Sequence, residues 1–276
     1  MKARITCLIC LLPWAVGAHA DPINVALGTA SSFAVLAGST VTNTGATEIN
    51  GDIGVWPGSS LTGFSTVTQT NGVVHNDDTI AALAQSDLTT AYIAAASQPC
   101  DGTLTGQDLG GLTLNPGVYC FASSAQLTGA LTLNNAGANP NAAFVFQIAS
   151  ALTTASNASI LFTAPNQDAN VFWQIGSSAT LGTGTAFAGN ILAFTSITLD
   201  TGATIQCGSA LARNGAVTLD ANSVSIGGTG CDTSIGGGPT TPPITPVPEP
   251  GTVSLLGSGL LGLIGYGRQR LRGPAV

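Results

Sequence analysis

Short apolar runs that each carry a threonine recur through the second half of the chain. In each run an apolar residue precedes the threonine, and Gly, Asn, Asp or Ala follows close behind. Six such phrases occupy residues 112–115, 131–134, 152–155, 179–182, 197–200 and 217–220. Alternating apolar and polar positions are typical of a strand with one buried face, and the small polar residues suit the corners between strands. The pattern therefore predicts a mainly β fold.

The distance between the phrases indicates how these strands are arranged. Their threonines are 19, 21, 27, 18 and 20 residues apart. A repeat of about 20 residues is typical of a stacked architecture, and it is too short for a pair of helices. We therefore expect a β-solenoid in which each repeat forms one coil and the 27-residue step contains an insertion. A β-sandwich also spaces its strands closely, but it does not require the same phrase six times.

One segment alone has helical spacing. Asn76, Asp77 and Asp78 supply capping side chains, and Pro99 marks the end. Between them the apolar positions that recur at helical spacing are Ile80, Leu83, Ala84, Leu88, Ala91, Tyr92 and Ala95. Because this stripe is rich in alanine, we expect one long helix that lies close against a flat partner. His75 is expected in a loop before it.

Both ends of the chain have the composition of targeting segments. Residues 1–20 combine Lys2 and Arg4 with an apolar run and a final Ala-His-Ala, which predicts a secretory signal peptide. Residues 247–276 contain Pro248, Glu249 and Pro250, then an apolar stretch and a basic tail. This order resembles the PEP-CTERM sorting signal of Gram-negative bacteria. The resemblance implies recognition by an exosortase-type membrane enzyme; a plain C-terminal membrane anchor is the alternative.

These segments divide the chain into four parts. We expect a signal peptide at 1–20, a solenoid domain at 21–234, a linker rich in Gly, Pro and Thr at 235–246, and the sorting signal at 247–276. The protein is then exported, and its destination is the cell surface, the extracellular matrix or the medium. The membrane anchor is either transient or retained.

Charge and histidine content exclude several kinds of partner. Between residues 21 and 246 the chain has no lysine, and Arg213 is its only arginine. Such a surface does not attract phosphate backbones, so nucleic acid is not expected as a partner. After the signal, His75 is the only histidine and no CxxC occurs, so a zinc site is not expected either.

Four cysteines follow the signal segment. An even number in an exported protein favours disulfides, and three pairings are possible. We favour local pairing because each bond closes a modest loop: Cys100 with Cys120, and Cys207 with Cys231.

Candidate enzyme and metal sites are weak. Asp200 and Asp220 occupy equivalent places in two repeats and form the one candidate pair of carboxylates for glycoside hydrolysis, but corner residues of this type usually form turns. Residues 227–232 spell a calcium-binding repeat that occurs only once. Residues 257–262 spell a dinucleotide fingerprint inside the C-terminal apolar segment, where no strand precedes it. We predict no catalytic residue, no cofactor and no metal.

Repeated threonines on stacked coils form a lattice. Strands stack about 4.8 Å apart, and residues on one face of a strand lie about 6.7 Å apart. Threonine has a restricted χ1 angle, which fixes its methyl and hydroxyl groups in advance. A flat, rigid and uncharged array of this kind matches the surface of ice.

Two long stretches also resemble a known family. Residues 27–64 are similar to the opening of the microbial ice-binding (antifreeze) proteins, and residues 187–219 are similar to their closing segment. The resemblance implies a right-handed, discontinuous β-helix with one long α-helix packed alongside. Ser209 departs from the family, which often has arginine there.

The resemblance also implies a T-[AG]-x-[TN] pattern on the ice-binding face. Residues 44–47, 154–157 and 201–204 match it. Together with the repeated threonines, this gives the ice-binding candidates Thr44, Thr47, Thr153, Thr154, Thr180, Thr183, Thr198, Thr201, Thr204 and Thr218.

Three functions from different classes follow from the sequence. The first is an exported, monomeric protein that adsorbs to ice and inhibits its growth or recrystallisation. The second is a structural or adhesive protein of the cell surface or exopolysaccharide matrix. The third, a carbohydrate-active enzyme, is disfavoured by the shortage of basic residues and histidine.

Overall fold

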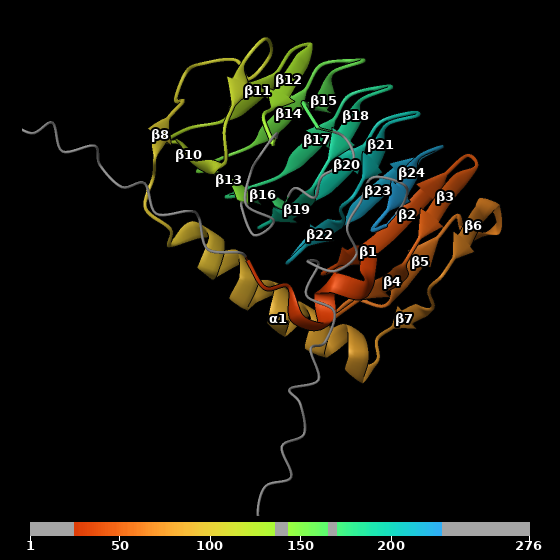
Figure 1. The fold of residues 1–276 in the computed structure, drawn as a ribbon. Helices are drawn as coiled ribbons and strands as arrows, with labels where there is room; N and C mark the ends of the chain where they lie inside the picture. Colours follow the sequence, from red (N-terminus) through yellow and green to blue (C-terminus); the bar gives the residue numbers. More distant parts are fainter. Residues whose placement is uncertain (1–24, 136–142, 165–169, 228–276) are drawn as a thin grey trace, which may run out of the picture. The chain divides into compact units, whose positions relative to one another are not determined.

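The computed structural model describes residues 25–135, 143–164 and 170–227 (Figure 1). The predicted signal peptide, the linker, the sorting signal and Cys231 lie outside the described residues. None of the helices in the described part of the chain combines the length and the apolar character that a membrane span requires.

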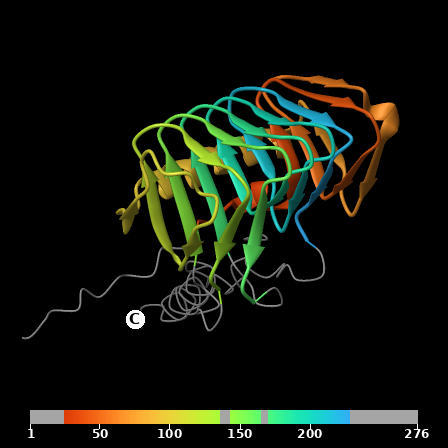
Figure 2. The ribbon, with the colours of Figure 1, turned by 90° about the horizontal axis from the view of Figure 1, so that it is seen from above.

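Three parallel sheets surround one core and form a β-solenoid (Figures 1 and 2). In spatial order the described strands of sheet A are β7 (Val74–Asn76), β4 (Asp52–Val55), β1 (Phe33–Ala37), β22 (Ala210–Ala212), β19 (Asn190–Ala193), β16 (Asn170–Ile175), β13 (Ala143–Ile148), β10 (Gly117–Phe121) and β8 (Gly102–Thr103). Those of sheet B are β11 (Ala125–Leu127), β14 (Leu152–Thr154), β17 (Ala179–Leu181), β20 (Ile197–Leu199), β23 (Val217–Asp220), β2 (Thr40–Thr44) and β5 (Ser60–Thr62). Those of sheet C are β6 (Val67–Thr70), β3 (Thr47–Asn50), β24 (Ser223–Ser225), β21 (Thr204–Gln206), β18 (Ala186–Ala188), β15 (Ser159–Phe162), β12 (Ala130–Leu133) and β9 (Thr113–Leu114). Two short 3₁₀ turns, η1 (Gly28–Ser32) and η2 (Phe64–Thr66), precede β1 and β6.

The order of the coils differs from the order of the chain. Each coil runs from sheet A to sheet B to sheet C, and the last coil, β22 to β24, pairs in parallel with the first, β1 to β3. This joint brings Thr218 opposite Thr42 and Val224 opposite Ile49. The predicted discontinuous solenoid is thus confirmed, because the N-terminal coils extend a stack that the C-terminal coils complete.

Helix α1 (Thr79–Ala96) lies along the outer face of sheet A (Figure 1). It begins at Asp78, whose side chain accepts a hydrogen bond of 2.8 Å from the Ala81 N–H. Its buried residues are Ala81, Ala84, Gln85, Leu88, Ala91 and Ala95. Small side chains let the helix approach the sheet, as the alanine-rich pattern predicted.

Two of the predicted contact positions on this helix are wrong. Ile80 is 42% exposed and Leu83 is 50% exposed. Successive residues of a helix are separated by about 100° of rotation, so each of these lies one step away from the stripe of Ala81, Ala84 and Leu88 that touches the sheet.

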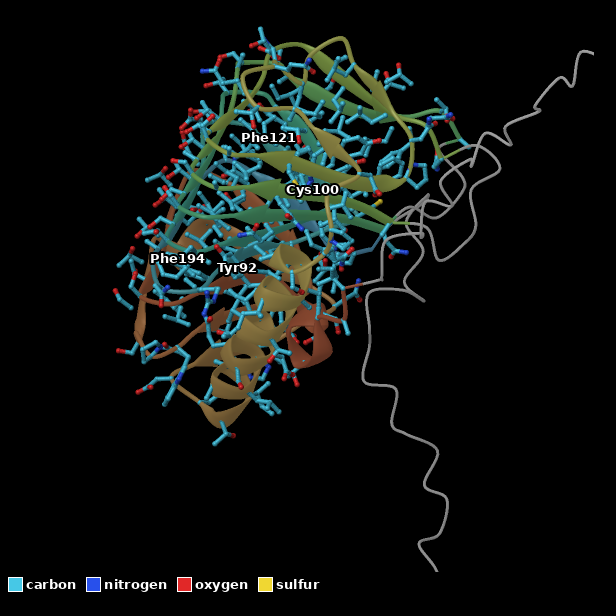
Figure 3. The ribbon with its side chains drawn as sticks, turned by 90° about the vertical axis from the view of Figure 1, so that its left-hand side faces the viewer. Tyr92, Cys100, Phe121 and Phe194 are labelled. Atoms are coloured by element: carbon cyan, nitrogen blue, oxygen red, sulfur yellow. A yellow bond between two sulfur atoms is a disulfide. The ribbon has the colours of Figure 1, made fainter. Side chains whose placement is uncertain are left out.

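An aromatic cluster joins the C-terminal half of the helix to the corner between sheets A and B. Tyr92 of α1 and Phe194, which follows β19, have ring centroids 6.2 Å apart (Figure 3). The Arg213 guanidinium lies over both rings, 4.7 Å from the Tyr92 centroid and 5.4 Å from the Phe194 centroid. Arg213 thus contacts both α1 and the segment that follows β19.

Large aromatic side chains fill the solenoid core. Phe146 and Trp173 stack on neighbouring strands with ring centroids 3.8 Å apart and planes within 6°. The Trp173 Nε1–H donates a hydrogen bond of 3.0 Å to the Ala188 carbonyl, so its polar atom is satisfied. Trp173 is fully buried and serves packing.

The disulfide prediction is confirmed for one pair. Cys100 and Cys120 are bonded, with Cα atoms 5.9 Å apart, and they join the segment after α1 to β10. Cys207 is also disulfide-bonded. Its pairing with Cys231 stays a prediction, because Cys231 lies outside the described residues.

The six threonine phrases do not all occupy one sheet, which corrects the periodicity argument. Thr113 and Thr132 lie in β9 and β12 of sheet C, whereas the later four belong to sheet B. The step of 21 residues from Thr132 to Thr153 therefore crosses from sheet C to sheet B. Similar phrases recur because both sheets bury alternate apolar residues against the same core.

Candidate functional site

An unbroken row of threonines runs across the outer face of sheet B. Strand pairing places six threonines one above another, with Gln126 at one end: Gln126, Thr153, Thr180, Thr198, Thr218, Thr42 and Thr62. The residues on either side of the five ladder threonines from Thr153 to Thr42 point inward, as Val41 and Asn43 do beside Thr42. We call these six threonines the B ladder.

The dimensions of the B ladder follow from the strand spacing. Five steps separate Thr153 from Thr62, so the row is about 24 Å long at about 4.8 Å a step. The Thr62 hydroxyl donates a hydrogen bond of 3.2 Å to the Thr42 hydroxyl, which orients two members of the row. Their branched side chains have few rotamers, so the array is fixed before any ligand arrives.

The rows beside the B ladder consist mostly of small residues. Two positions before each ladder residue stand Ser124, Ala151, Ser178, Ser196, Ala216, Thr40 and Ser60. Two positions after the five ladder threonines from Thr153 to Thr42 stand Ala155, Gly182, Asp200, Asp220 and Thr44. Serine, alanine and glycine do not rise above the threonines, so the face stays level. Its carboxylates are confined to the edge next to sheet C.

Hydrogen bonds hold the Asp220 carboxylate at this edge. The Thr44 hydroxyl donates to Asp220 Oδ1 over 2.9 Å, and the Thr201 hydroxyl donates to Asp220 Oδ2. The bonds from Thr201 and then Thr44 lower the pKa of Asp220 below its usual range. Asp220 is the last residue of β23, and two threonine hydroxyls from the neighbouring coils hold its carboxylate.

Two of the predicted ice-binding threonines are buried and do not belong to the surface. Thr47 is 1% exposed, and its hydroxyl accepts a hydrogen bond of 3.1 Å from the Asn222 N–H. Thr154 is 3% exposed, and its hydroxyl lies 2.7 Å from that of Thr185. These hydroxyls satisfy polar groups inside the corner between sheets B and C.

The T-[AG]-x-[TN] pattern does not mark a single row of side chains, because its three matches stand in different registers. Thr44 comes two residues after the ladder threonine Thr42, whereas Thr154 comes one after Thr153 and Thr201 comes three after Thr198. Thr154 therefore points into the core, whereas Thr44 and Thr201 lie exposed at the corner between sheets B and C.

The remaining candidates lie beyond the B ladder. Thr183 is exposed at the corner that follows β17, and Thr204 lies in β21 of sheet C. Sequence reasoning also missed two members of the row, Thr42 and Thr62. Asn43 replaces the usual apolar residue after Thr42, and Gly63 follows Thr62, so neither matched the repeated phrase.

Sheet C offers a less regular surface. One outward row there reads Ala130, Ser159, Ala186, Thr204, Ser223, Glu48 and Thr68. It changes residue type at nearly every step and contains a carboxylate. Sheet A is covered by α1. Sheet B is thus the face with a repeating, uncharged ladder.

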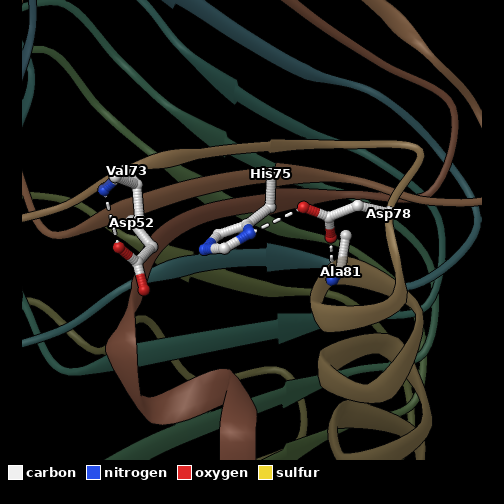
Figure 4. A network of polar contacts seen from close by, with 5 residues as sticks. All are labelled: Asp52, Val73, His75, Asp78 and Ala81. Carbon is white, nitrogen blue, oxygen red and sulfur yellow. Dashed lines mark hydrogen bonds and ion pairs between the residues drawn. The ribbon is translucent and has the colours of Figure 1, made fainter.

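His75, the one histidine in the described residues, contacts a carboxylate and an aromatic ring. His75 lies in β7, not in a loop as expected, and its Nδ1 is 2.8 Å from Asp78 Oδ2 (Figure 4). Its ring packs against Phe33 with centroids 5.4 Å apart. Within the described residues no group of three His, Cys, Asp or Glu side chains could hold a metal ion.

Comparison with known proteins agrees with this geometry. Residues 35–225 match the family described as ice-binding-like. The chain belongs to this family. It is 58% identical to an ice-binding protein of Nostoc sp. (strain HG1) over 89% of this chain and 87% of that one. Residues 246–270 match the PEP-CTERM protein-sorting motif.

Solved structures of the ice-binding-like family share the fold. An ice-binding protein from an Antarctic biological consortium is 46% identical, with a TM-score of 0.68 over 73% of this chain and 90% of that one. An ice-binding protein of the Antarctic ascomycete Antarctomyces psychrotrophicus is 41% identical, with a TM-score of 0.68 over 74% of this chain and 99% of that one. In the present protein, Ser209 is 1% exposed, and its Oγ has no hydrogen-bond partner within the described residues.

Proposed function

We propose that this protein is exported and adsorbs to ice through the B ladder, which inhibits ice growth or recrystallisation. The observation that carries the proposal is the register: six threonines from six coils stand in one uninterrupted row. Family membership and the names of the relatives support ice as the ligand.

The chemistry of the row suits a crystal of water. Each threonine offers a methyl group, beside which water orders, and a hydroxyl group, which bonds that water. Because the side chains are held by stacked strands, little conformational entropy is lost on adsorption. No single contact has to be strong, since the number of matching contacts sets the affinity.

The lack of charge in the B ladder and in the row that precedes it supports the same ligand. A charged side chain holds its own hydration shell, and removing that shell costs free energy. Between residues 21 and 246 the one basic residue is Arg213, which is engaged with Tyr92 and Phe194 away from the ladder. The proposed location of the protein follows from the PEP-CTERM motif, which we take as the recognition site of an exosortase-type enzyme.

The test of ice binding is nanolitre osmometry on oxidised residues 21–246. We expect a gap between the melting and freezing points of a single ice crystal, together with faceted growth. A folded sample that gives no gap and round crystals would overturn the proposal and favour the second candidate, a structural or adhesive protein of the surface or matrix, on the PEP-CTERM motif alone.

A further inference from the structure

The outer face of α1 lacks the charged side chains that a solvent-exposed helix usually carries. Asp87 is the one charged residue of Thr79–Ala96, and its carboxylate accepts a hydrogen bond of 2.8 Å from the Thr29 N–H. Among the described residues seven large apolar side chains are exposed, and six of them lie on α1 or next to it: Ile80, Leu83 and Ile93 on the helix, Val73 and Val74 before it, and Phe194 against Tyr92. Exposed apolar surface is therefore concentrated on the side of the solenoid that α1 covers (Figure 1).

One stripe of residues along this face reads the same from both ends. Its six members are all exposed and follow one another at steps of four, three, four, three and four residues: Thr79, Leu83, Ser86, Thr90, Ile93 and Ser97. We call these six residues the α1 stripe. In chemical terms their order is hydroxyl, aliphatic, hydroxyl, hydroxyl, aliphatic, hydroxyl. The stripe is thus symmetric about position 88, where Leu88 points the opposite way, into the contact with sheet A.

This symmetry suits a second copy of the same chain. At an interface built on a two-fold axis, residue i of one copy contacts residue j of the other, and j contacts i. An antiparallel pair of α1 helices that meet at position 88 brings Leu83 against Ile93 of the second copy. The same pairing brings Ser86 against Thr90 of the second copy. Each aliphatic side chain then meets an aliphatic one, and each hydroxyl meets a hydroxyl.

We propose that the α1 stripe is the contact surface of a homodimer in which the two α1 helices pack antiparallel. Exposed apolar patches of this kind mark interaction sites. The dimer differs from the monomer expected from the sequence, and it does not depend on ice as the ligand. Because α1 covers sheet A and the B ladder lies on sheet B, pairing leaves both ladders uncovered.

The polar groups of the α1 stripe can enter such an interface without losing their hydrogen bonds. The Thr90 hydroxyl donates a hydrogen bond of 3.2 Å to the Ser86 carbonyl, and the Ser97 hydroxyl donates one of 3.0 Å to the Ala94 carbonyl. Both groups are satisfied within their own helix, so covering them leaves no orphaned donor. Ser86 and Thr90 flank the centre of the pair, and their small side chains let the helix axes approach within the usual range of about 8–10 Å.

Charge restricts where two copies of this domain can meet. Residues 21–246 carry twelve acidic side chains and one arginine, so two copies repel each other. The α1 stripe contains no charge, and Asp87 beside it is held by the Thr29 N–H. Exposed charges more than about 8 Å apart are largely screened at physiological ionic strength. A contact confined to the stripe therefore brings no acidic side chain into the interface.

The size of the helix sets the strength of the contact. The 18 residues of α1 span about 27 Å at about 1.5 Å each. A strip of that length and about 10 Å wide is small beside the roughly 800 Å² that each partner contributes to a stable interface. We therefore expect a weak dimer, which forms at high protein concentration and dissociates on dilution.

Sedimentation velocity on oxidised residues 21–246 measures the association. These residues contain the whole solenoid core and α1. The weight-average mass should rise from that of one chain at about 1 μM towards twice that mass at about 1 mM. A mass that stays at the value for one chain over this range would overturn the proposal.

Two leucine variants provide the matched comparison. Leu83 of the α1 stripe and Leu161 on sheet C are each 50% exposed, so Leu83→Glu and Leu161→Glu make the same chemical change at equal exposure. Leu83→Glu should weaken the dimer at least tenfold, because it places an unpaired charge against an aliphatic side chain. Leu161→Glu should leave it unchanged. Equal weakening by the two variants, with both shown to be folded by circular dichroism, would mean that the association does not use α1.

Disulfide trapping tests the antiparallel register without any loss of stability. The Leu83→Cys protein and the Ile93→Cys protein are incubated in a thiol–disulfide buffer, each alone and then mixed, with a size tag on one of them. We expect a covalent dimer between the two variants in the mixture, since positions 83 and 93 face each other across the pair. Covalent dimers of each variant with itself, and none between the two, would mean a parallel pair and overturn the proposal.

Discussion

Thr153 and Thr154 are adjacent in sequence, yet the structure gives them opposite roles. Thr153 belongs to the B ladder, whereas Thr154 is 3% exposed and points into the solenoid. Replacing each by valine keeps the branching and approximate size of the side chain and exchanges its hydroxyl group for a methyl group. The two variants therefore separate surface chemistry from internal hydrogen bonding.

The cost of Thr154→Val follows from its contacts. The Thr154 hydroxyl accepts a hydrogen bond of 2.9 Å from the Gly182 N–H and lies 2.7 Å from the Thr185 hydroxyl. Thr185 has another acceptor, the Ala155 carbonyl at 3.2 Å, but the Gly182 N–H would be left buried and unsatisfied. One such orphan costs about 1–3 kcal/mol. For a domain of this size that lowers Tm by about 2–4 °C for each kcal/mol.

Thr153→Val should instead leave stability nearly unchanged and reduce ice-binding activity. Its hydroxyl is at the surface, so the free energy of unfolding should change by less than about 0.5 kcal/mol. The freezing gap should shrink, because one anchoring hydroxyl of the row is missing. Urea unfolding gives the stability, and nanolitre osmometry at equal concentrations of folded protein gives the activity. A Thr154→Val variant that loses activity at unchanged stability would refute the assignment of the two faces.

Three further predictions concern other parts of the molecule. Thr62→Tyr, at the end of the B ladder, should reduce the freezing gap less than Thr198→Tyr at its centre, since more of the row remains in contact; osmometry of both decides this. Replacing Cys100 and Cys120 by serine opens a loop of 20 residues, which should cost about 3 kcal/mol in urea unfolding. Asp78→Ala removes the cap of α1 and should cost about 1 kcal/mol, whereas Asp78→Asn should keep the cap and flatten the dependence of stability on pH in acid.

The sign of that pH dependence follows from the folded-state pKa. The pKa of Asp78 is lowered, first by the hydrogen bond from the Ala81 N–H and then by the side chain of His75, while burial opposes the shift. A carboxylate with a lowered pKa contributes stability above its unfolded pKa of about 3.9 and loses it as the pH falls through the folded value. Wild-type protein should therefore lose stability in acid more steeply than Asp78→Asn; equal slopes would contradict this.

Sequence reasoning reached the solenoid, the helix and four of the six ladder threonines, because alternation and repeat length are local properties. It did not reach the joint between the first and last coils, where Thr42 meets Thr218 across 176 residues; only family resemblance implied it. It also could not assign the buried Thr47 and Thr154, since one step of register turns a side chain from surface to core. A four-residue motif does not determine which of its threonines faces outward, because its position relative to the strand can differ from one coil to the next.

One comparison of three proteins decides whether the B ladder is the surface that binds ice. The freezing gap of residues 21–246 is measured for wild type, Thr198→Tyr and Thr132→Tyr, after circular dichroism has shown that all three are folded. We expect Thr198→Tyr to lose most of the gap and Thr132→Tyr to keep it. The reverse pattern would place the ice-binding surface on sheet C instead of sheet B.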